Sequence, residues 1–317
     1  MNIVFPDRID FDDATKAKIK VLGITTYNDV PADEATVIER IRDAELITAN
    51  FVAITRRVID AAPRLKFIVS SAVGYNHIDY QYALSKDIKV LNCPTQNANA
   101  VAEHAIALML AVSHKVLEAN TSLREGKWNG LDMLGTELGQ KKLGLVGYGR
   151  VGKLIERKVA GFNMTIRYVN STSTDQDLDI LLQESDIVCL CLTLDETTRH
   201  IINQRRLLML KPHAILINIA RGAVIDQAAL LNALKQKTFC AAGLDVYENE
   251  PTSGHVPPDV LELVKLPNVV ATPHIAYNTE ETTTRLGEEL FKNIESCLNG
   301  RPKNIINIKE VRSPLKS

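Results

Sequence analysis

Short apolar runs alternate with segments of helical periodicity along most of the chain. In the first hundred residues, runs with the length and composition of strands occupy 20–24, 46–49, 65–69 and 88–91, and helical spacing occupies 36–44 and 55–62. After residue 140, strand candidates occupy 142–146, 165–169, 187–192, 214–218, 241–246 and 269–271. Helical patterns lie between them at 153–160, 178–183, 205–210 and 227–236. Apolar strands separated by helices predict an α/β fold with parallel sheets covered on both faces.

Three further segments organise this alternation. Residues 94–99 are polar and contain a proline, which indicates a crossover between two domains. Residues 100–119 are apolar around the whole helical circumference, so we expect one long helix, buried between domains or in a dimer interface. Residues 282–298 form an amphipathic helical pattern, and Pro302 and Pro314 follow it. The first hundred residues therefore predict one compact α/β unit, and a second begins after them.

Composition excludes several classes of function. The 317 residues carry a net charge of −1, with 45% hydrophobic and 24% charged residues, so neither a nucleic acid nor a membrane is an expected partner. The N-terminus lacks a basic segment followed by an apolar core, and five cysteines, an odd number, argue against a disulfide framework. We therefore expect a cytoplasmic protein.

Cys189 and Cys191 share one face of a predicted strand. No third and fourth metal ligand follows at a suitable spacing, so we interpret both as small buried apolar residues and expect no metal site.

A glycine-rich turn supplies the strongest chemical signal. Gly147, Gly149 and Gly152 form a GxGxxG pattern, with Arg150 and Val151 inside it, directly after an apolar strand and at the start of a helix. In this context the pattern is typical of dinucleotide binding: the glycines allow a tight turn, close approach to a pyrophosphate and close helix–strand packing. The helix N-terminus offers free N–H groups to the phosphates.

Three side chains that follow predicted strands form a candidate active site: Arg221, Glu250 and His274. Ligands bind at the carboxyl ends of strands in open α/β sheets. A guanidinium binds a carboxylate and polarises a carbonyl, an imidazole transfers a proton, and a carboxylate orients the imidazole. Each residue alone fits an ordinary ion pair or loop position, so the combination carries the hypothesis.

The motifs around these residues resemble those of the D-isomer-specific 2-hydroxyacid dehydrogenase family, and of its glyoxylate/hydroxypyruvate reductase-like members, over nearly the full length. The arginine, glutamate and histidine motifs lie at 218–226, 244–251 and 271–276, and secondary motifs lie at 71–79, 101–104 and 124–128. Six separate blocks occur in the family's order, which makes the resemblance highly specific.

The resemblance implies roles for individual residues. Arg221 would bind the substrate carboxylate and carbonyl, and His274 would act as acid and base supported by Glu250. Backbone N–H groups of Val73 and Gly74 would hold the substrate carboxylate. Three further residues would bind the cofactor. Asp245 would anchor the nicotinamide amide, and Thr193 and Ile219 would line the cofactor.

The resemblance also implies the architecture: two doubly wound parallel-sheet domains, with a Rossmann nucleotide domain inserted into a flavodoxin-like substrate domain. Residues 1–99, completed by 282–317, would form the substrate-binding domain, and residues 100–281 the dinucleotide-binding domain. The family implies a homodimer, which agrees with the apolar helix after Asn99.

One departure bears on the cofactor. Family members that use NAD usually place an aspartate where this chain has Asn170. Aspartate accepts from a ribose 2′-hydroxyl and repels a 2′-phosphate, whereas asparagine keeps an acceptor without the charge. The hydroxyl groups of Ser171 and of the two residues after it are able to bind a phosphate, although no arginine directly follows Asn170. The cofactor is NAD or NADP, and the sequence favours NADP.

The sequence thus predicts an NAD(P)-dependent oxidoreductase acting on CH–OH groups, which interconverts a small 2-oxo acid and its D-2-hydroxy acid. One alternative is an enzyme like phosphoglycerate dehydrogenase, but no basic cluster for a phosphorylated substrate is evident. Another is a dinucleotide-sensing binding protein of the corepressor kind. His104 and His114 belong to the apolar helix, where we predict a packing role.

Overall fold

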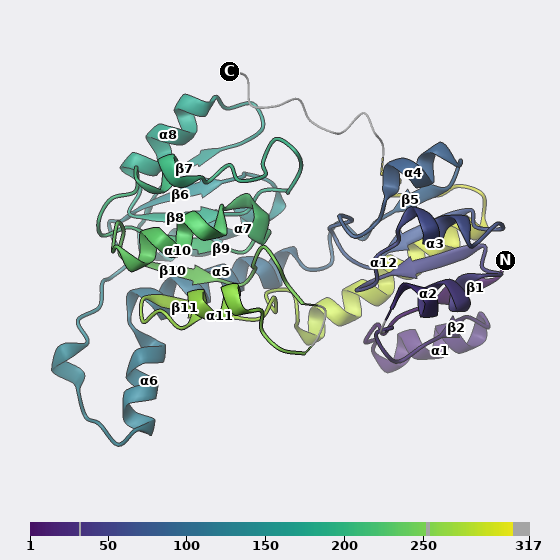
Figure 1. The fold of residues 1–317 in the computed structure, drawn as a ribbon, viewed down its shortest axis with the longest axis horizontal. Coiled ribbons are helices and arrows are strands. Elements are labelled where there is room, and N and C mark those ends of the chain that lie inside the picture. Colours follow the sequence, from purple (N-terminus) through teal and green to yellow (C-terminus); the bar gives the residue numbers. More distant parts are fainter. Residues whose placement is uncertain (32, 252–253, 307–317) are drawn as a thin grey trace. The chain divides into compact units, whose positions relative to one another are not determined.

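The computed structural model describes residues 1–31, 33–251 and 254–306, and these divide into two compact units (Figure 1). The first unit consists of Met1–Asn97 and the segment that starts at Asn278, and the second of Ala98–Tyr277. Part of the predicted segment 282–317 lies outside the described residues. The division into a substrate-binding and a dinucleotide-binding domain stays a prediction.

The first unit contains a five-stranded parallel sheet in the order β2-β1-β3-β4-β5. Its strands are β1 (Ile3–Phe5), β2 (Thr25–Thr26), β3 (Leu46–Ala49), β4 (Phe67–Ser70) and β5 (Lys89–Leu91). Its helices are α1 (Asp13–Val21), α2 (Glu34–Ile41), α3 (Arg56–Asp60), α4 (Tyr80–Ser85) and α12 (Glu280–Leu298). Apolar residues of α2, α3 and α4 pack on one face of the sheet, and those of α12 pack on the other.

The second unit contains a six-stranded parallel sheet in the order β11-β10-β9-β8-β6-β7. Its strands are β6 (Lys142–Val146), β7 (Thr165–Val169), β8 (Ile187–Leu190), β9 (Ile215–Asn218), β10 (Ala241–Leu244) and β11 (Val269–Ala271). Its α-helices are α5 (Ala98–Ser113), α6 (Val116–Arg124), α7 (Arg150–Val159), α8 (Asp175–Glu184), α9 (Gln204–Leu207), α10 (Gln227–Lys235) and α11 (Pro258–Val264). Short 3₁₀ turns lie at Gly130–Asp132, Ala160–Phe162 and Gly222–Val224.

Two apolar layers cover this second sheet. Residues of α5 and α7 pack on one face, and residues of α8 to α11 pack on the other. Both sheets have the doubly wound order 2-1-3-4-5, counted along the chain, and β11 adds a sixth strand to the second. The prediction of two doubly wound parallel sheets is confirmed. Among the residues that the structure describes, no strand lies beyond β7, where the 3-2-1-4-5-6 order would place one.

The predicted strand at 20–24 is wrong. Asp12 accepts a hydrogen bond from the Thr15 N–H and so caps α1, which continues to Val21. Gly23 then turns the chain at a φ of +63°. Val21 is 85% exposed, whereas Ile24, after the turn, packs in the core. The three-residue strand β1 was not predicted.

The predicted single helix at 100–119 is also wrong, because it is divided. Lys115 adopts a left-handed φ of +52° between α5 and α6, and the two helices are bent by 62°. The Thr136 N–H donates to the carbonyl oxygen of Ser113, so a distant segment binds the end of α5. In Figure 1, α6 lies away from the six-stranded sheet, whereas α5 packs on it.

Within the described residues, no single helix is long and apolar enough to cross a membrane. The bent pair of α5 and α6 passes that test, by length and composition only.

Candidate active site

The glycine turn lies at the switch point of the second sheet, between β6 and β8, where the chain leaves the sheet in opposite directions. Gly147 adopts a φ of +99°, and a Cβ there would lie 2.7 Å from the carbonyl oxygen of Cys191, just after β8. A Cβ on Gly152 would lie 2.7 Å from the carbonyl oxygen of Gly147. Both positions therefore require glycine for close backbone packing.

Gly149 has a different surrounding. A Cβ built on it meets nothing within 4 Å, and its backbone is extended, with φ −86°. It is the N-cap residue of α7, where no side chain caps the helix and the first turn carries no acidic residue. N–H groups that no N-cap side chain binds, at the positive end of a ten-residue helix, are the donor set that a pyrophosphate requires. The residues of this turn fit a dinucleotide.

The other predicted cofactor residues border the same carboxyl edge. Arg150 and Val151 begin α7, Thr193 is exposed in the loop after β8, and Ile219 is buried just after β9. Asn170 follows β7 in a turn that Ser171 continues.

The turn after β9 places Arg221. Asn218, which is buried, donates to the Arg221 carbonyl oxygen and accepts from the Ala220 N–H. A Cβ on Gly222 would lie 1.8 Å from the carbonyl carbon of Tyr247, so only glycine lets this turn contact the loop after β10. Burial lowers the pKa of the Arg221 guanidinium, and the Glu250 carboxylate opposes that effect. Arginine keeps its charge under such a shift.

Glu250 and His274 form a hydrogen-bonded pair. Glu250 Oε2 lies 2.6 Å from His274 Nδ1, and Glu250 Oε1 accepts from the Tyr247 N–H at 2.8 Å. Because an ionised carboxylate only accepts, Nδ1 carries the proton, and Nε2 on the opposite side of the ring is the atom that exchanges protons. His274 is 37% exposed and lies edge-on to the Tyr277 ring, with the centroids 6.1 Å apart.

Asp245 directly follows β10, and its carbonyl oxygen accepts from the His274 N–H at 2.8 Å. It is 1% exposed, and its carboxylate accepts from the Thr272 hydroxyl and from the Ile275 and Ala276 N–H groups. Its contact with the nicotinamide amide stays a prediction.

Val73 and Gly74 belong to the first unit, in the loop after β4. Asn92 Nδ2 donates to the Val73 carbonyl oxygen at 2.8 Å, and Ser70 Oγ donates to that of Gly74 at 2.8 Å. Two side chains thus fix the carbonyl groups of this loop. Sequence reasoning missed Ser70 and Asn92, as it missed Asn218 and Thr272, because their partners lie elsewhere in the fold or on the backbone.

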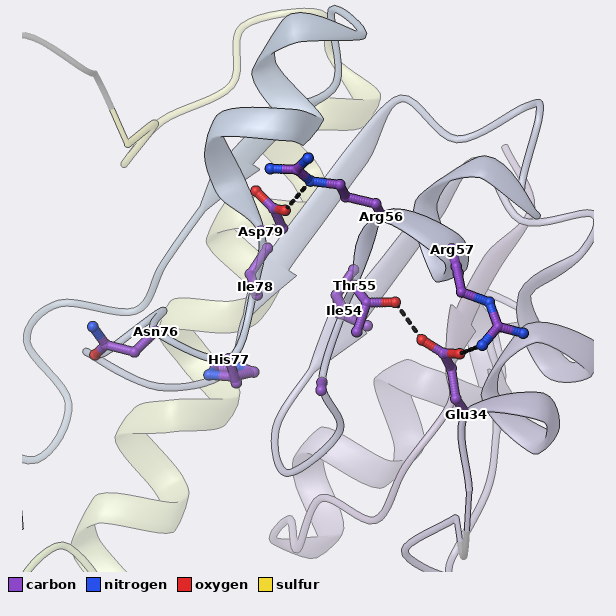
Figure 2. A pocket seen from close by; sticks show the side chains of 10 residues that line it. Glu34, Ile54, Thr55, Arg56, Arg57, Asn76, His77, Ile78 and Asp79 are labelled. Atoms are coloured by element: carbon purple, nitrogen blue, oxygen red, sulfur yellow. Dashed lines mark hydrogen bonds and ion pairs between the residues drawn. The ribbon is translucent and has the colours of Figure 1, made fainter. Parts of the chain in front are cut away.

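A cavity of about 680 Å³ lies elsewhere in the first unit, beside α3 and the loop before α4 (Figure 2). Arg56 is paired with Asp79, and Glu34 binds both Thr55 and Arg57, so both arginines are neutralised. The cavity contains none of the predicted site residues. Within the described part of the chain, no group of three or more His, Cys, Asp or Glu residues is arranged to hold a metal ion.

Residues 106–276 match the model of the D-isomer specific 2-hydroxyacid dehydrogenase, NAD binding domain. The chain is 37% identical over 305 residues to a glyoxylate reductase from Korarchaeum cryptofilum, with 90% of each chain covered. The chain belongs to the D-isomer specific 2-hydroxyacid dehydrogenase family. The resemblance inferred from the motifs is confirmed, and the chain is an NAD(P)-dependent oxidoreductase of this family.

Solved structures agree with this assignment. An acyclic imino acid reductase in complex with NADPH and D-Arg matches with a TM-score of 0.86 at 30% identity, covering 97% of this chain and 100% of the other. An NADPH-dependent glyoxylate/hydroxypyruvate reductase from Sinorhizobium meliloti, in complex with NADP and malonate, matches with a TM-score of 0.83 at 27% identity, covering 100% and 98%.

Proposed function

We propose that this enzyme reduces a small 2-oxo acid of the glyoxylate or hydroxypyruvate type to the D-2-hydroxy acid. The observation that carries this proposal is the hydrogen bond of 2.6 Å between Glu250 Oε2 and His274 Nδ1, which leaves Nε2 for proton transfer. Similarity to glyoxylate reductases supports the choice of substrate.

In the proposed mechanism, the glycine turn at Gly147, Gly149 and Gly152 would hold a dinucleotide, whose chemistry would be hydride transfer to the substrate carbonyl carbon. His274 Nε2 donates a proton to the carbonyl oxygen, and Glu250 stabilises the charged imidazole and fixes its tautomer. Arg221 binds the substrate carboxylate and polarises the carbonyl, and the N–H groups of Val73 and Gly74 bind the same carboxylate. In the reverse direction His274 accepts the proton.

For the cofactor we propose NADP. Asn170 Oδ1 accepts from both the N–H and the hydroxyl of Thr172, at 2.9 and 2.7 Å, so the acceptor is engaged within its own turn. The amide nitrogen of Asn170 lies on the other side of the side chain and is a donor. A donor without negative charge suits a 2′-phosphate better than a ribose hydroxyl that needs an acceptor.

We also propose a homodimer. The segment from α6 to residue 137 carries large apolar side chains that water reaches: Leu123 is 57% exposed, Trp128 89%, Leu131 102% and Leu134 87%. Exposed apolar patches of this kind mark protein interfaces, and sedimentation of the native protein tests the assignment.

The proposed activity is tested by following NADPH and NADH oxidation with glyoxylate, hydroxypyruvate, pyruvate and a bulkier 2-oxo acid. We expect turnover, faster with NADPH, and a decrease in kcat of about 10²- to 10⁴-fold for His274→Ala. Dinucleotide affinity should not change, because His274 is not in the phosphate turn.

His274→Asn is the matched control, since asparagine tolerates the left-handed φ of +54° but transfers no proton. It should be as inactive as the alanine variant. Dinucleotide binding without turnover on any acid would instead favour a sensor protein.

A further inference from the structure

A second histidine of the same unit is connected to the loop that carries His274. His104 projects from α5 and is largely buried, with 18% of its side chain exposed. Its Nε2 lies 3.0 Å from Thr272 Oγ1 and 3.4 Å from Asp245 Oδ1. Thr272 and Asp245 follow different strands, β11 and β10, so His104 joins the ends of both.

The direction of these hydrogen bonds fixes the tautomer of His104. The Thr272 hydroxyl donates its proton to Asp245 Oδ1 at 2.6 Å, because the carboxylate only accepts. Thr272 Oγ1 is then an acceptor toward His104, so Nε2 carries a proton and donates. The result is a directed chain from His104 through Thr272 to Asp245.

Asp245 is the centre of this arrangement. Burial acts to raise its pKa, but hydrogen bonds from His104, Thr272 and the Ala276 and Ile275 N–H groups outweigh burial, and the pKa is lowered. The carboxylate is therefore the charged form that these donors bind.

The loop that Asp245 holds is strained at the catalytic position. His274 has a φ of +54°, a left-handed conformation that is unfavourable for a residue with a Cβ. Its N–H donates to the Asp245 carbonyl oxygen at 2.8 Å, and the next two N–H groups donate to the Asp245 carboxylate. Such a conformation persists only where its surroundings fix it.

We propose that His104 is a positioning residue for His274, which acts by donating a hydrogen bond to Thr272 and thereby fixing the Asp245 carboxylate against the 274–276 backbone. The proposal rests on the function proposed above, in which His274 transfers the proton. It replaces the packing role that the sequence predicted for His104. Asp245 and Thr272 transmit the effect, and His104 itself touches no reacting atom.

The test compares His104→Leu, which fills the space without a donor, with His104→Gln, which retains an amide donor at similar reach. His114→Leu is the control, because His114 is an exposed histidine just beyond the end of the same helix. For His104→Leu we expect kcat to decrease about tenfold while the dinucleotide Kd stays within about twofold. His104→Gln should recover most of the loss, and His114→Leu should behave as the native enzyme.

A second readout does not depend on activity. Hydrogen exchange of the Ile275 and Ala276 amides in the protein without substrate should accelerate in His104→Leu, but not in the glutamine or control variants. Native turnover and exchange in His104→Leu, or equal losses in the leucine and glutamine variants, would overturn the proposal. If the native protein reduces no 2-oxo acid, the proposed function fails, and the exchange result alone decides whether His104 fixes the loop.

Discussion

The two sheets share one strand order, yet the carboxyl ends of their first strands have opposite chemistry. In the second unit, β6 leads into glycines and an uncapped helix N-terminus. In the first unit, β1 leads to Asp7, a fully buried carboxylate that accepts from the Phe51 and Val52 N–H groups. The first helix of that unit is capped by Asp12.

The comparison teaches that a switch point is a place for a ligand only where side chains leave its N–H groups available. Asp7 and Asp12 satisfy those donors in the first unit with carboxylates, which would also repel a phosphate. In the second unit, Gly149 provides no side-chain cap and the first turn of α7 carries no carboxylate. Topology thus locates two equivalent positions, and residue chemistry selects one of them.

Of the changes that test this comparison, the largest effect on dinucleotide affinity is expected when the second unit receives a capping carboxylate like that of the first. Gly149→Asp places a capping carboxylate at the start of α7, where space and backbone conformation permit it. A negative charge about 5 Å from a phosphate costs roughly 3 kcal/mol at an effective dielectric of 20, so dinucleotide affinity should decrease about 100-fold. Isothermal titration measures it. Gly149→Ser caps without charge, and an equal loss in both variants would assign the effect to space rather than charge.

A smaller effect is expected at the ends of the second strands. In the first unit Asp29 follows β2 and is paired with Arg40, whereas in the second Asn170 follows β7 without a charge. Asn170→Asp should lower the ratio of NADPH to NADH efficiency about fivefold, because an added carboxylate that water screens contributes about 1 kcal/mol. Kinetics with both cofactors measure it. Thr172→Val is the control: it removes one donor to Asn170 without adding charge, so it should change the ratio less. An unchanged ratio in Asn170→Asp would mean that the ribose 2′ group of the cofactor does not bind at this residue.

The last effect is on stability rather than on cofactor binding, and it concerns the buried acid of the first unit. Burial raises the pKa of Asp7, and its Oδ1 has no hydrogen-bond partner in the described structure. The native fold therefore binds this proton more tightly than the unfolded chain. The contribution of Asp7 to stability is present below the unfolded pKa and is lost as pH rises through the folded pKa.

Asp7→Asn resembles the protonated acid at every pH, so its stability relative to the native protein should increase as pH rises from about 3 towards 7. The gain is about 1.4 kcal/mol for each unit by which folding raises the pKa. Urea unfolding at several pH values measures it, with Asp10→Asn, an exposed acid, as control. A stability difference that does not vary with pH would contradict the buried-acid interpretation.

Local sequence patterns predicted most of the fold. Strands such as β3 and β6 were predicted at their observed bounds, because parallel strands buried on both faces are mostly apolar. The division of the helix at Lys115 was not predictable, since Thr136 binds its end from a later part of the chain. β1 was missed because three residues carry too little periodicity.

The candidate site divides in the same way. Arg221, Glu250 and His274 were inferred because each follows a strand, and their motifs are local. The residues that position these side chains were not inferred, because their hydrogen bonds join distant parts of the chain: His104 and Thr272 are 168 residues apart. Gly222 was part of a motif, but its reason, contact with Tyr247, appears only in the fold.

The exposed Trp128 has an optical consequence. It is the single tryptophan of the chain, and it lies in the loop after α6. Indole emission moves to shorter wavelength when the ring leaves water. The intrinsic fluorescence of this protein therefore reports on whether that loop is covered, and dilution should shift its emission to the red if the cover is a second copy of the chain.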